Sequence, residues 1–308
     1  MMEEKLLNEF LGNLESHNTL KCYKRDIIIF ESYLQNNFSH LKSFLEIDRT
    51  HALSYKKWLL ESDQAPKSIN RKLSSLSAFY RFLMDQNMMD RNPLEGIKRP
   101  RQEVLTQTLD LTDAEVVLLI EKIKSSKSSS SMHLAILFLL FSTGLRKSEV
   151  LHLKFKDLKL QGKPPQLTVK TKGQKVLTKV LHPSCVIILE NYIKWMKSLK
   201  KNTRSQDYVF RPSNNPLSGN LEGPLNPKSL DYILKSWAKR AGIFKRLSPH
   251  SARATYIGSA LEQGVDIYKL AQDVGHSSVK TTEEYNKRKR QLKDSPVYSI
   301  GFLKNISA

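Results

Sequence analysis

A short stretch at residues 142–149, Ser-Thr-Gly-Leu-Arg-Lys-Ser-Glu, places Arg146 in a predicted tight turn. The apolar run before it, residues 132–141, predicts a buried helix, and Gly144 is typical of a helix end that precedes a new helix. Such a turn would hold the Arg146 guanidinium against packed core, where its fork of donors suits a phosphate oxygen. Glu149 can pair with Arg146 and fix its orientation. Taken alone, an ordinary helix-end arginine is the better interpretation.

Further along the chain, two histidines and an arginine stand at predicted helix ends. His250 and Arg253 follow Pro249 at a helix start, so they share one face near a terminus that favours anions. A single histidine there is more often a cap or core residue, but the pair in a basic protein favours an anion site. His276 follows Gly275, which ends a short predicted helix, and could donate to a phosphate.

A lysine and a tyrosine are ambiguous when each is considered by itself. Lys172 lies in Thr171-Lys-Gly-Gln174, between predicted strands at residues 167–170 and 175–181. A lysine in such a turn is usually solvated. Tyr285 falls on a predicted last helix, residues 277–290, where a tyrosine is usually half-buried core.

Taken together, Arg146, Lys172, His250-x-x-Arg253, His276 and Tyr285 resemble, in type and order, the tyrosine recombinase family of Xer-like and phage-integrase-like DNA strand-exchange enzymes. The resemblance covers about residues 4–295. The stretch from Val274 to Tyr285 is similar to the family's stretch that ends in the nucleophile, and residues 170–175 (Lys-Thr-Lys-Gly-Gln-Lys) look like the hairpin of its catalytic lysine. Lys170 and Lys175 remain competitors for that role.

The chain departs from the family pattern at a few positions. Ala252 and Ala254 replace the leucine and second histidine of the usual His-x-Leu-Arg-His motif, and Val274 replaces a leucine. These changes affect packing or an accessory position, and every catalytic residue type is retained.

The resemblance implies transesterification at a DNA phosphodiester. Tyr285 would attack phosphorus and form a 3′-phosphotyrosyl link, with His250 as general base and Lys172 as general acid. Arg146 and Arg253 would neutralise charge on the phosphate, His276 would add a donor, and Glu149 would support Arg146. We therefore expect no metal, ATP or other cofactor. The implied assembly is a homo-tetramer on two duplexes, joined through the C-terminal tail, with a partner recombinase or activator as a further option.

The net charge of +20 points to a polyanionic partner, and it is unevenly distributed. Residues 1–100 have a net charge of +2, whereas residues 101–308 contain 35 Lys and Arg against 17 Asp and Glu, a net of +18. Nucleic acid fits this better than an anionic membrane surface, because no strongly basic amphipathic anchor helix is evident. Two cysteines far apart, no signal peptide and no spanning segment predict a cytoplasmic protein with reduced thiols.

The predicted fold is mainly α with a small β-sheet. We expect a helical, SAM-like core-binding domain at residues 1–100, a basic linker at 101–110, and an α+β catalytic domain at 111–308 with a protomer-docking tail. Together they would form a C-shaped clamp on DNA. The predicted helices are residues 4–15, 19–35 (with Thr19 as N-cap), 48–61, 68–86, 112–124, 132–142, 148–153, 183–199, 226–241, one starting at 248, 266–274 and 277–290.

The polar face of the predicted helix 68–86 is a candidate DNA contact, because small hydroxyl side chains between cations allow close approach to a phosphate backbone. A solvated helix surface is an equally good interpretation. The candidate cations, which extend into the linker, are Lys67, Arg71, Lys72, Arg81, Arg99 and Arg101.

Two other functions remain open at this stage. An integrase of a mobile element would use the same chemistry, although the length and the lack of an added arm-binding domain favour a Xer-like role in dimer resolution. A basic DNA-binding protein without catalysis would have no reason to hold all six residue types in this order. A type IB topoisomerase shares much of the chemistry but acts as a monomer, which would leave the tail without a partner.

Overall fold

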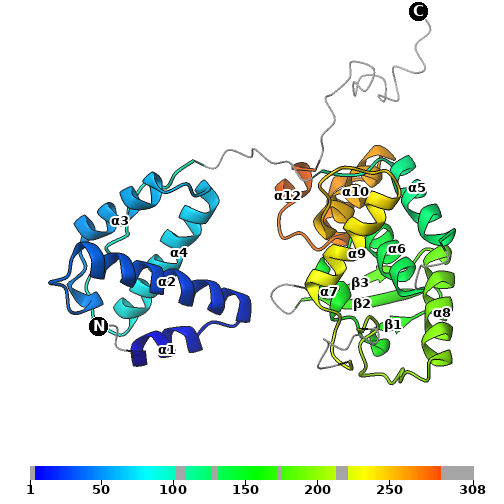
Figure 1. Cartoon of the computed structure of the whole chain (residues 1–308), viewed down its shortest axis with the longest axis horizontal. Helices are drawn as coiled ribbons and strands as arrows, with labels where there is room; N and C mark the ends of the chain where they lie inside the picture. Colours follow the sequence, from blue (N-terminus) through cyan, green and yellow to red (C-terminus); the bar gives the residue numbers. More distant parts are fainter. Residues whose placement is uncertain (1–3, 102–108, 127–130, 172–174, 213–220, 286–308) are drawn as a thin grey trace, which may run out of the picture. The chain divides into compact units, whose positions relative to one another are not determined.

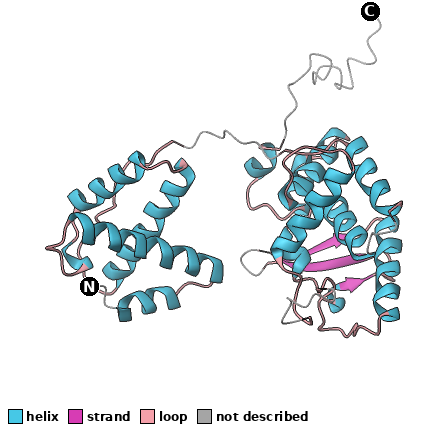
Figure 2. Ribbon diagram, in the orientation of Figure 1, coloured by secondary structure: helices cyan, strands magenta, loops and turns pink. Residues whose placement is uncertain are grey.

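The computed structural model describes residues 4–101, 109–126, 131–171, 175–212 and 221–285. Contacts divide the chain into two compact units, Met1–Thr106 and Gln107–Ala308, each considered by itself below (Figure 1). Residues 102–108 of the predicted linker, and the predicted tail, lie outside the described residues. The mainly helical fold with one small sheet is confirmed (Figure 2).

The first unit consists of helices around one apolar core. They are α1 (Glu4–Gly12), α2 (His17–Asn37), the 3₁₀ turn η1 (Phe44–Glu46), α3 (Arg49–Glu61) and α4 (Pro66–Asp85). The prediction of Thr19 as an N-cap is wrong. Ser16 caps α2 instead, because its side chain accepts from the Thr19 N–H, which places Thr19 within the first turn.

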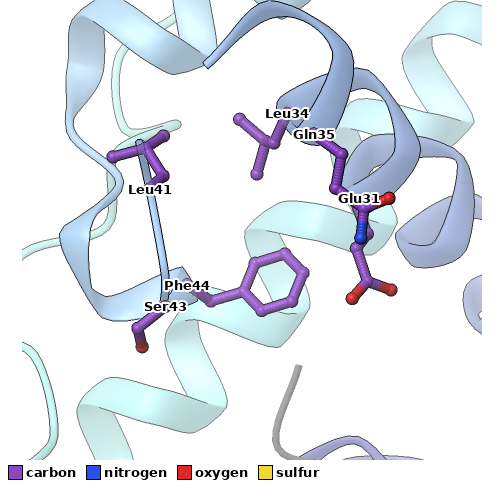
Figure 3. Close-up of a pocket in the computed structure, with 6 residues that line it drawn as sticks. All are labelled: Glu31, Leu34, Gln35, Leu41, Ser43 and Phe44. Atoms are coloured by element: carbon purple, nitrogen blue, oxygen red, sulfur yellow. The ribbon is translucent and has the colours of Figure 1, made fainter. Parts of the chain in front are cut away.

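A buried ion pair joins α2 to α4 in this unit. The carboxylate of Asp26, fully buried, accepts from the guanidinium of Arg71 and, at 3.1 Å, from the hydroxyl of Ser75. Elsewhere in the unit, Leu34, Leu41 and Phe44 surround a small, mostly apolar pocket between α2 and η1 (Figure 3).

The second unit packs helices beside a three-stranded antiparallel sheet (Figure 2). The strands, in the order β1-β2-β3, are β1 (Leu158–Lys159), β2 (Gln166–Lys170) and β3 (Val176–Val180). The helices are α5 (Asp113–Lys124), α6 (Ser131–Thr143), α7 (Lys147–Leu151), α8 (Pro183–Ser198), α9 (Pro227–Arg240), α10 (Pro249–Glu262), α11 (Ile267–Asp273) and α12 (Val279–Glu283), with a 3₁₀ turn η2 (Phe155–Asp157). The two-residue strand β1 was not predicted, since it is too short to show an alternating pattern.

Helix α6 is the centre of this unit's core, and it is apolar on every side as the sequence predicts. It ends at Thr143, and Gly144 then takes φ +62°, the left-handed conformation that favours glycine. An added Cβ on Gly144 would lie 2.5 Å from Cδ1 of Tyr256 on α10. The glycine therefore allows both the sharp turn into α7 and close packing against α10.

The last described helix is much shorter than predicted. Helix α12 ends at Glu283, so Tyr285 lies in the turn that follows, with its N–H donating to the Thr282 carbonyl at 3.1 Å. The predicted continuation to residue 290 falls outside the described residues. Tyr285 is thus positioned by a tight turn after the helix.

The packing at Gly144 gives a test by substitution. We expect Gly144→Ala to destabilise the protein by about 2–5 kcal/mol, because the left-handed strain adds to overpacking against Tyr256. Gly242→Ala is the matched control, since Gly242 has φ +75° but no atom within 4 Å of an added Cβ, and strain alone should cost it about 1–2 kcal/mol. Urea unfolding of both variants checks this, and equal midpoints would contradict it.

Candidate active site

The predicted nucleophile and the predicted base lie in hydrogen-bonding contact. The Tyr285 hydroxyl is 3.1 Å from Nε2 of His250, the second residue of α10. The Tyr285 ring also stacks on the ring of His276, with centroids 6.1 Å apart and planes 16° apart. Burial raises the pKa of the Tyr285 phenol, so it is protonated at neutral pH and needs a base to become a nucleophile.

Arg146 is held through both its main chain and its side chain by Glu149. The two oxygens of the buried carboxylate accept from the Arg146 backbone N–H at 2.7 Å and from Nη1 at 2.8 Å. The predicted ion pair is therefore present, and it also caps α7. The other end of the guanidinium, Nη2, donates to the Gly275 carbonyl at 3.2 Å.

Arg253 is the most deeply buried charge of this cluster, with 1 % of its surface exposed. Its Nη1 donates to the Gly144 carbonyl at 2.7 Å, and its Nη2 donates to the Val274 carbonyl. Burial and the neighbouring charge of Arg146 lower its pKa to about 10, which still leaves it charged at neutral pH. The neighbouring positive charges of Arg146 and Arg253 together attract an anion strongly.

His276 lies behind the tyrosine ring and is fixed by a residue that the sequence analysis missed. Its Nδ1 is 2.8 Å from the hydroxyl of Thr282, a fully buried residue of α12. Burial, followed by the charges of Arg253 and Arg146, lowers the His276 pKa to about 4, so the imidazole is neutral at pH 7. When the Thr282 hydroxyl donates to Nδ1, the proton resides on Nε2, where it can be donated to a ligand.

The stem of the β2–β3 hairpin lies beside these residues, although Lys172 is outside the described residues. Thr171 closes the stem through its N–H, which donates to the Lys175 carbonyl at 2.7 Å. A Cβ added to Gly275 would lie 3.6 Å from Cγ2 of Thr171 and 3.9 Å from Nη1 of Arg146. The base of the hairpin thus packs against the turn that leads into His276.

The candidate DNA-contact residues of the first unit differ in exposure. Lys67 and Arg71 line one hollow of the α4 surface together with Ser68, Asn70 and Ser74. Lys67, Arg81, Arg99 and Arg101 are exposed, and Arg99 donates to the Asn70 carbonyl at 2.8 Å.

Lys72 does not belong to this surface. It is 5 % exposed, donates to the Gln64 side chain, and has its pKa lowered by burial, so its predicted place on the polar face is wrong. The residue lies on the side of α4 that packs into the unit.

Within the described ranges, no group of three His, Cys, Asp or Glu side chains could hold a metal ion. In the same ranges, no helix is both long and apolar enough to cross a membrane. The site is built instead from two guanidinium groups, two imidazoles and a phenol.

The low pKa of His276 predicts a defined pH dependence. The unfolded chain takes up a proton on this residue near pH 6.5, whereas the folded protein resists protonation down to about pH 4. The contribution of His276 to stability is therefore full above pH 6.5 and is lost as the pH falls from 6.5 through 4. We expect His276→Gln to flatten this part of the pH profile of urea unfolding. Parallel profiles of the variant and the wild type would rule the shift out.

The contact with Thr282 can be tested separately by its effect on the His276 tautomer. Thr282→Val keeps the shape but leaves Nδ1 without its hydroxyl partner, so ¹⁵N NMR should show a mixture of tautomers in place of one. We expect any DNA cleavage rate to fall by up to about tenfold, the worth of one hydrogen bond. Thr282→Ser keeps the hydroxyl and should preserve the tautomer; a single tautomer in both variants would refute the role of Thr282.

The chain also matches known families and proteins. The sequence profile of the phage integrase family matches residues 110–291, and that of its N-terminal SAM-like domain matches residues 7–87. The tyrosine recombinase XerD of Listeria innocua is 30% identical over 91% of both chains, and that of Rickettsia conorii is 30% identical over 88% of both. XerC of Pediococcus pentosaceus is 27% identical over 91% of both.

Solved structures share the fold. The XerA recombinase aligns with a TM-score of 0.51 at 25% identity over 99% of both chains. The Tn1549 transposon integrase in complex with circular intermediate DNA aligns with a TM-score of 0.70 at 19% identity, over 96% of this chain and 98% of that one. With a family profile covering more than half of the chain and relatives at 30% identity along most of it, this protein belongs to the phage integrase family, the tyrosine recombinases, which are DNA strand-exchange enzymes.

Proposed function

We propose that this protein is a site-specific DNA recombinase that cuts and rejoins duplex DNA through a 3′-phosphotyrosyl link to Tyr285. The observation that carries the proposal is the 3.1 Å contact between the Tyr285 hydroxyl and His250, beside the buried Arg253 and the Arg146 that Glu149 holds. The sequence relatives named XerC and XerD support a Xer-like role in resolving chromosome or plasmid dimers.

In the first step, the Tyr285 oxygen attacks the scissile phosphorus while its proton passes to Nε2 of His250. The bond from phosphorus to the 5′-oxygen breaks, and Lys172 supplies the proton that this leaving oxygen takes up. Each proton transfer is worth roughly a hundredfold to ten-thousandfold. The 5′-hydroxyl of another strand reverses the step and releases Tyr285, so the covalent link conserves the energy of the phosphodiester.

The remaining residues stabilise the phosphate. The guanidinium groups of Arg146 and Arg253 each donate to a backbone carbonyl. Each has further N–H groups that can donate to the non-bridging oxygens. An anion between them would also relieve their mutual repulsion, which lowers the Arg253 pKa in addition to the larger effect of burial. Neutral His276 adds a donor through Nε2.

Binding of DNA would involve both units. The hollow lined by Lys67 and Arg71 on α4, with exposed Arg81, Arg99 and Arg101, supplies cations for the phosphate backbone in the first unit. The second unit carries most of the net positive charge. Assembly as a tetramer on two duplexes through the C-terminal tail, in the cytoplasm, completes the proposal.

Integration of a mobile element is the second candidate, since the Tn1549 transposon integrase has the same fold. Both roles use one chemistry, so they differ in the DNA site that becomes attached to Tyr285.

Covalent trapping tests the proposal. The wild type and Tyr285→Phe are expressed in host cells, which are lysed in strong detergent, and the ends of protein-linked DNA are sequenced. We expect a recurrent junction attached to the wild type and no linked DNA on the variant, which keeps the ring but lacks the hydroxyl. A junction at a chromosomal or plasmid dimer-resolution site supports the Xer-like role, and one at an element boundary supports integration. Equal DNA binding by both proteins with no linked DNA on either would favour a non-catalytic DNA-binding protein.

A further inference from the structure

A buried lysine lies below the site among apolar side chains. The inward-facing side chains of β2 and β3 are Leu167 and Val169 opposite Lys179 and Leu177, so an ammonium group occupies one of four positions in an apolar row. Lys179 is 2 % exposed, and burial lowers its pKa. A charge in such a place needs strong partners, because an unpaired buried cation is very unfavourable.

Those partners come from two other elements. The Lys179 ammonium forms an ion pair with the Asp273 carboxylate and also donates to the Asp273 carbonyl at 3.0 Å. Its nitrogen lies 4.8 Å from the centre of the Tyr256 ring, and the Tyr256 hydroxyl donates to the same carboxylate oxygen at 2.8 Å. Strand β3, helix α10 and the end of α11 are thereby joined through one carboxylate.

The cluster is close in sequence to the residues of the active site. Tyr256 follows Arg253 by one helical turn, Asp273 precedes His276 by three residues, and Lys179 lies on β3, seven residues after Lys172 in the sequence. Three successive carbonyls are each held by a different cation: Asp273 by Lys179, Val274 by Arg253 and Gly275 by Arg146. Cations are favoured there because the carbonyls form the negative end of α11.

Of these three cations, Lys179 is the one to which the proposed function assigns no contact with the phosphate. Its ammonium is covered by the Tyr256 ring and is satisfied by Asp273. Asp273 directly precedes Val274, whose carbonyl accepts from Arg253, and its negative charge is one of the smaller influences on the Arg253 guanidinium. A carboxylate freed from Lys179 would therefore compete with the scissile phosphate for Arg253.

We propose that Lys179 is a positioning residue for DNA cleavage, which holds the turn that leads into His276 and keeps the Asp273 carboxylate away from Arg253. This rests on the proposed function, because it concerns the same cleavage site. The proposal assigns Lys179 no contact with DNA. It predicts an effect on the chemical step and none on binding.

The test uses the full chain and a nicked oligonucleotide that carries the trapped junction. Lys179→Met keeps the length and apolar stem of the side chain but removes the ammonium. We expect the single-turnover rate of phosphotyrosyl formation to fall by about a hundredfold, as for a misplaced catalytic group, with DNA affinity unchanged. Tyr256→Phe is the matched control: it removes only the hydroxyl bond to Asp273 and should slow the step by at most about tenfold.

A second substitution separates positioning from simple loss of stability. In Lys179→Met/Asp273→Asn the competing carboxylate is gone, so the rate should recover to within about tenfold of the wild type. A double variant as slow as Lys179→Met would refute competition by the Asp273 carboxylate, and a single variant as fast as the wild type would overturn the whole proposal.

Hydrogen exchange gives a readout that does not depend on activity. The N–H groups of Gly275 and His276 donate to carbonyls of α11 at 3.0 and 2.9 Å, and both should exchange at least about tenfold faster in Lys179→Met. Unchanged exchange in Lys179→Met would refute the holding role, whatever the result of covalent trapping. A wild type that forms no link to DNA would refute the proposed function but not the holding role.

Discussion

The burial of the Arg253 guanidinium is the constraint on which the rest of the second unit depends. A cation with 1 % exposure must be solvated by the protein, and here the solvating groups are the carbonyls of Gly144 and Val274, from two turns far apart in sequence. Both turns must therefore present carbonyls toward α10. Gly144 meets this requirement through its left-handed conformation, and so does Gly275, with φ +65° in the second turn.

The same arrangement prepares the site for an anion. Backbone carbonyls offset the charge of Arg253 only in part, since they are dipoles, and both oxygens of Glu149 already accept from Arg146. The site therefore keeps positive charge in a place that water reaches poorly, where electrostatic attraction for a phosphate is strongest. The pKa of His276 is lowered first by its burial and then by this field, because a third positive charge beside two guanidinium groups is unfavourable.

Features set by local sequence were predictable, and features set by tertiary packing were not. The pair of Arg146 with Glu149 involves residues three apart, so a helical register determines it. Whether Lys72 or Lys179 faces solvent depends on which neighbours cover it, and no periodicity distinguishes a buried lysine from an exposed one. The contact between Tyr285 and His250 joins residues 35 apart in the chain; family resemblance predicted both residues, but their 3.1 Å separation required the fold.

The sheet is small, yet its position explains why a helical enzyme keeps one. A hairpin stem is a rigid support whose two ends can meet different parts of a site, and here Thr171 lies near Gly275 at one end while Lys179 holds Asp273 at the other. Both contacts are made to the segment that ends α11, so a shift of the hairpin would be transmitted to His276. Without the sheet, the segment that ends α11 would lose its contacts with Thr171 and Lys179 and keep those with Arg146 and Arg253. In the proposed function those two arginines are the groups that engage the phosphate.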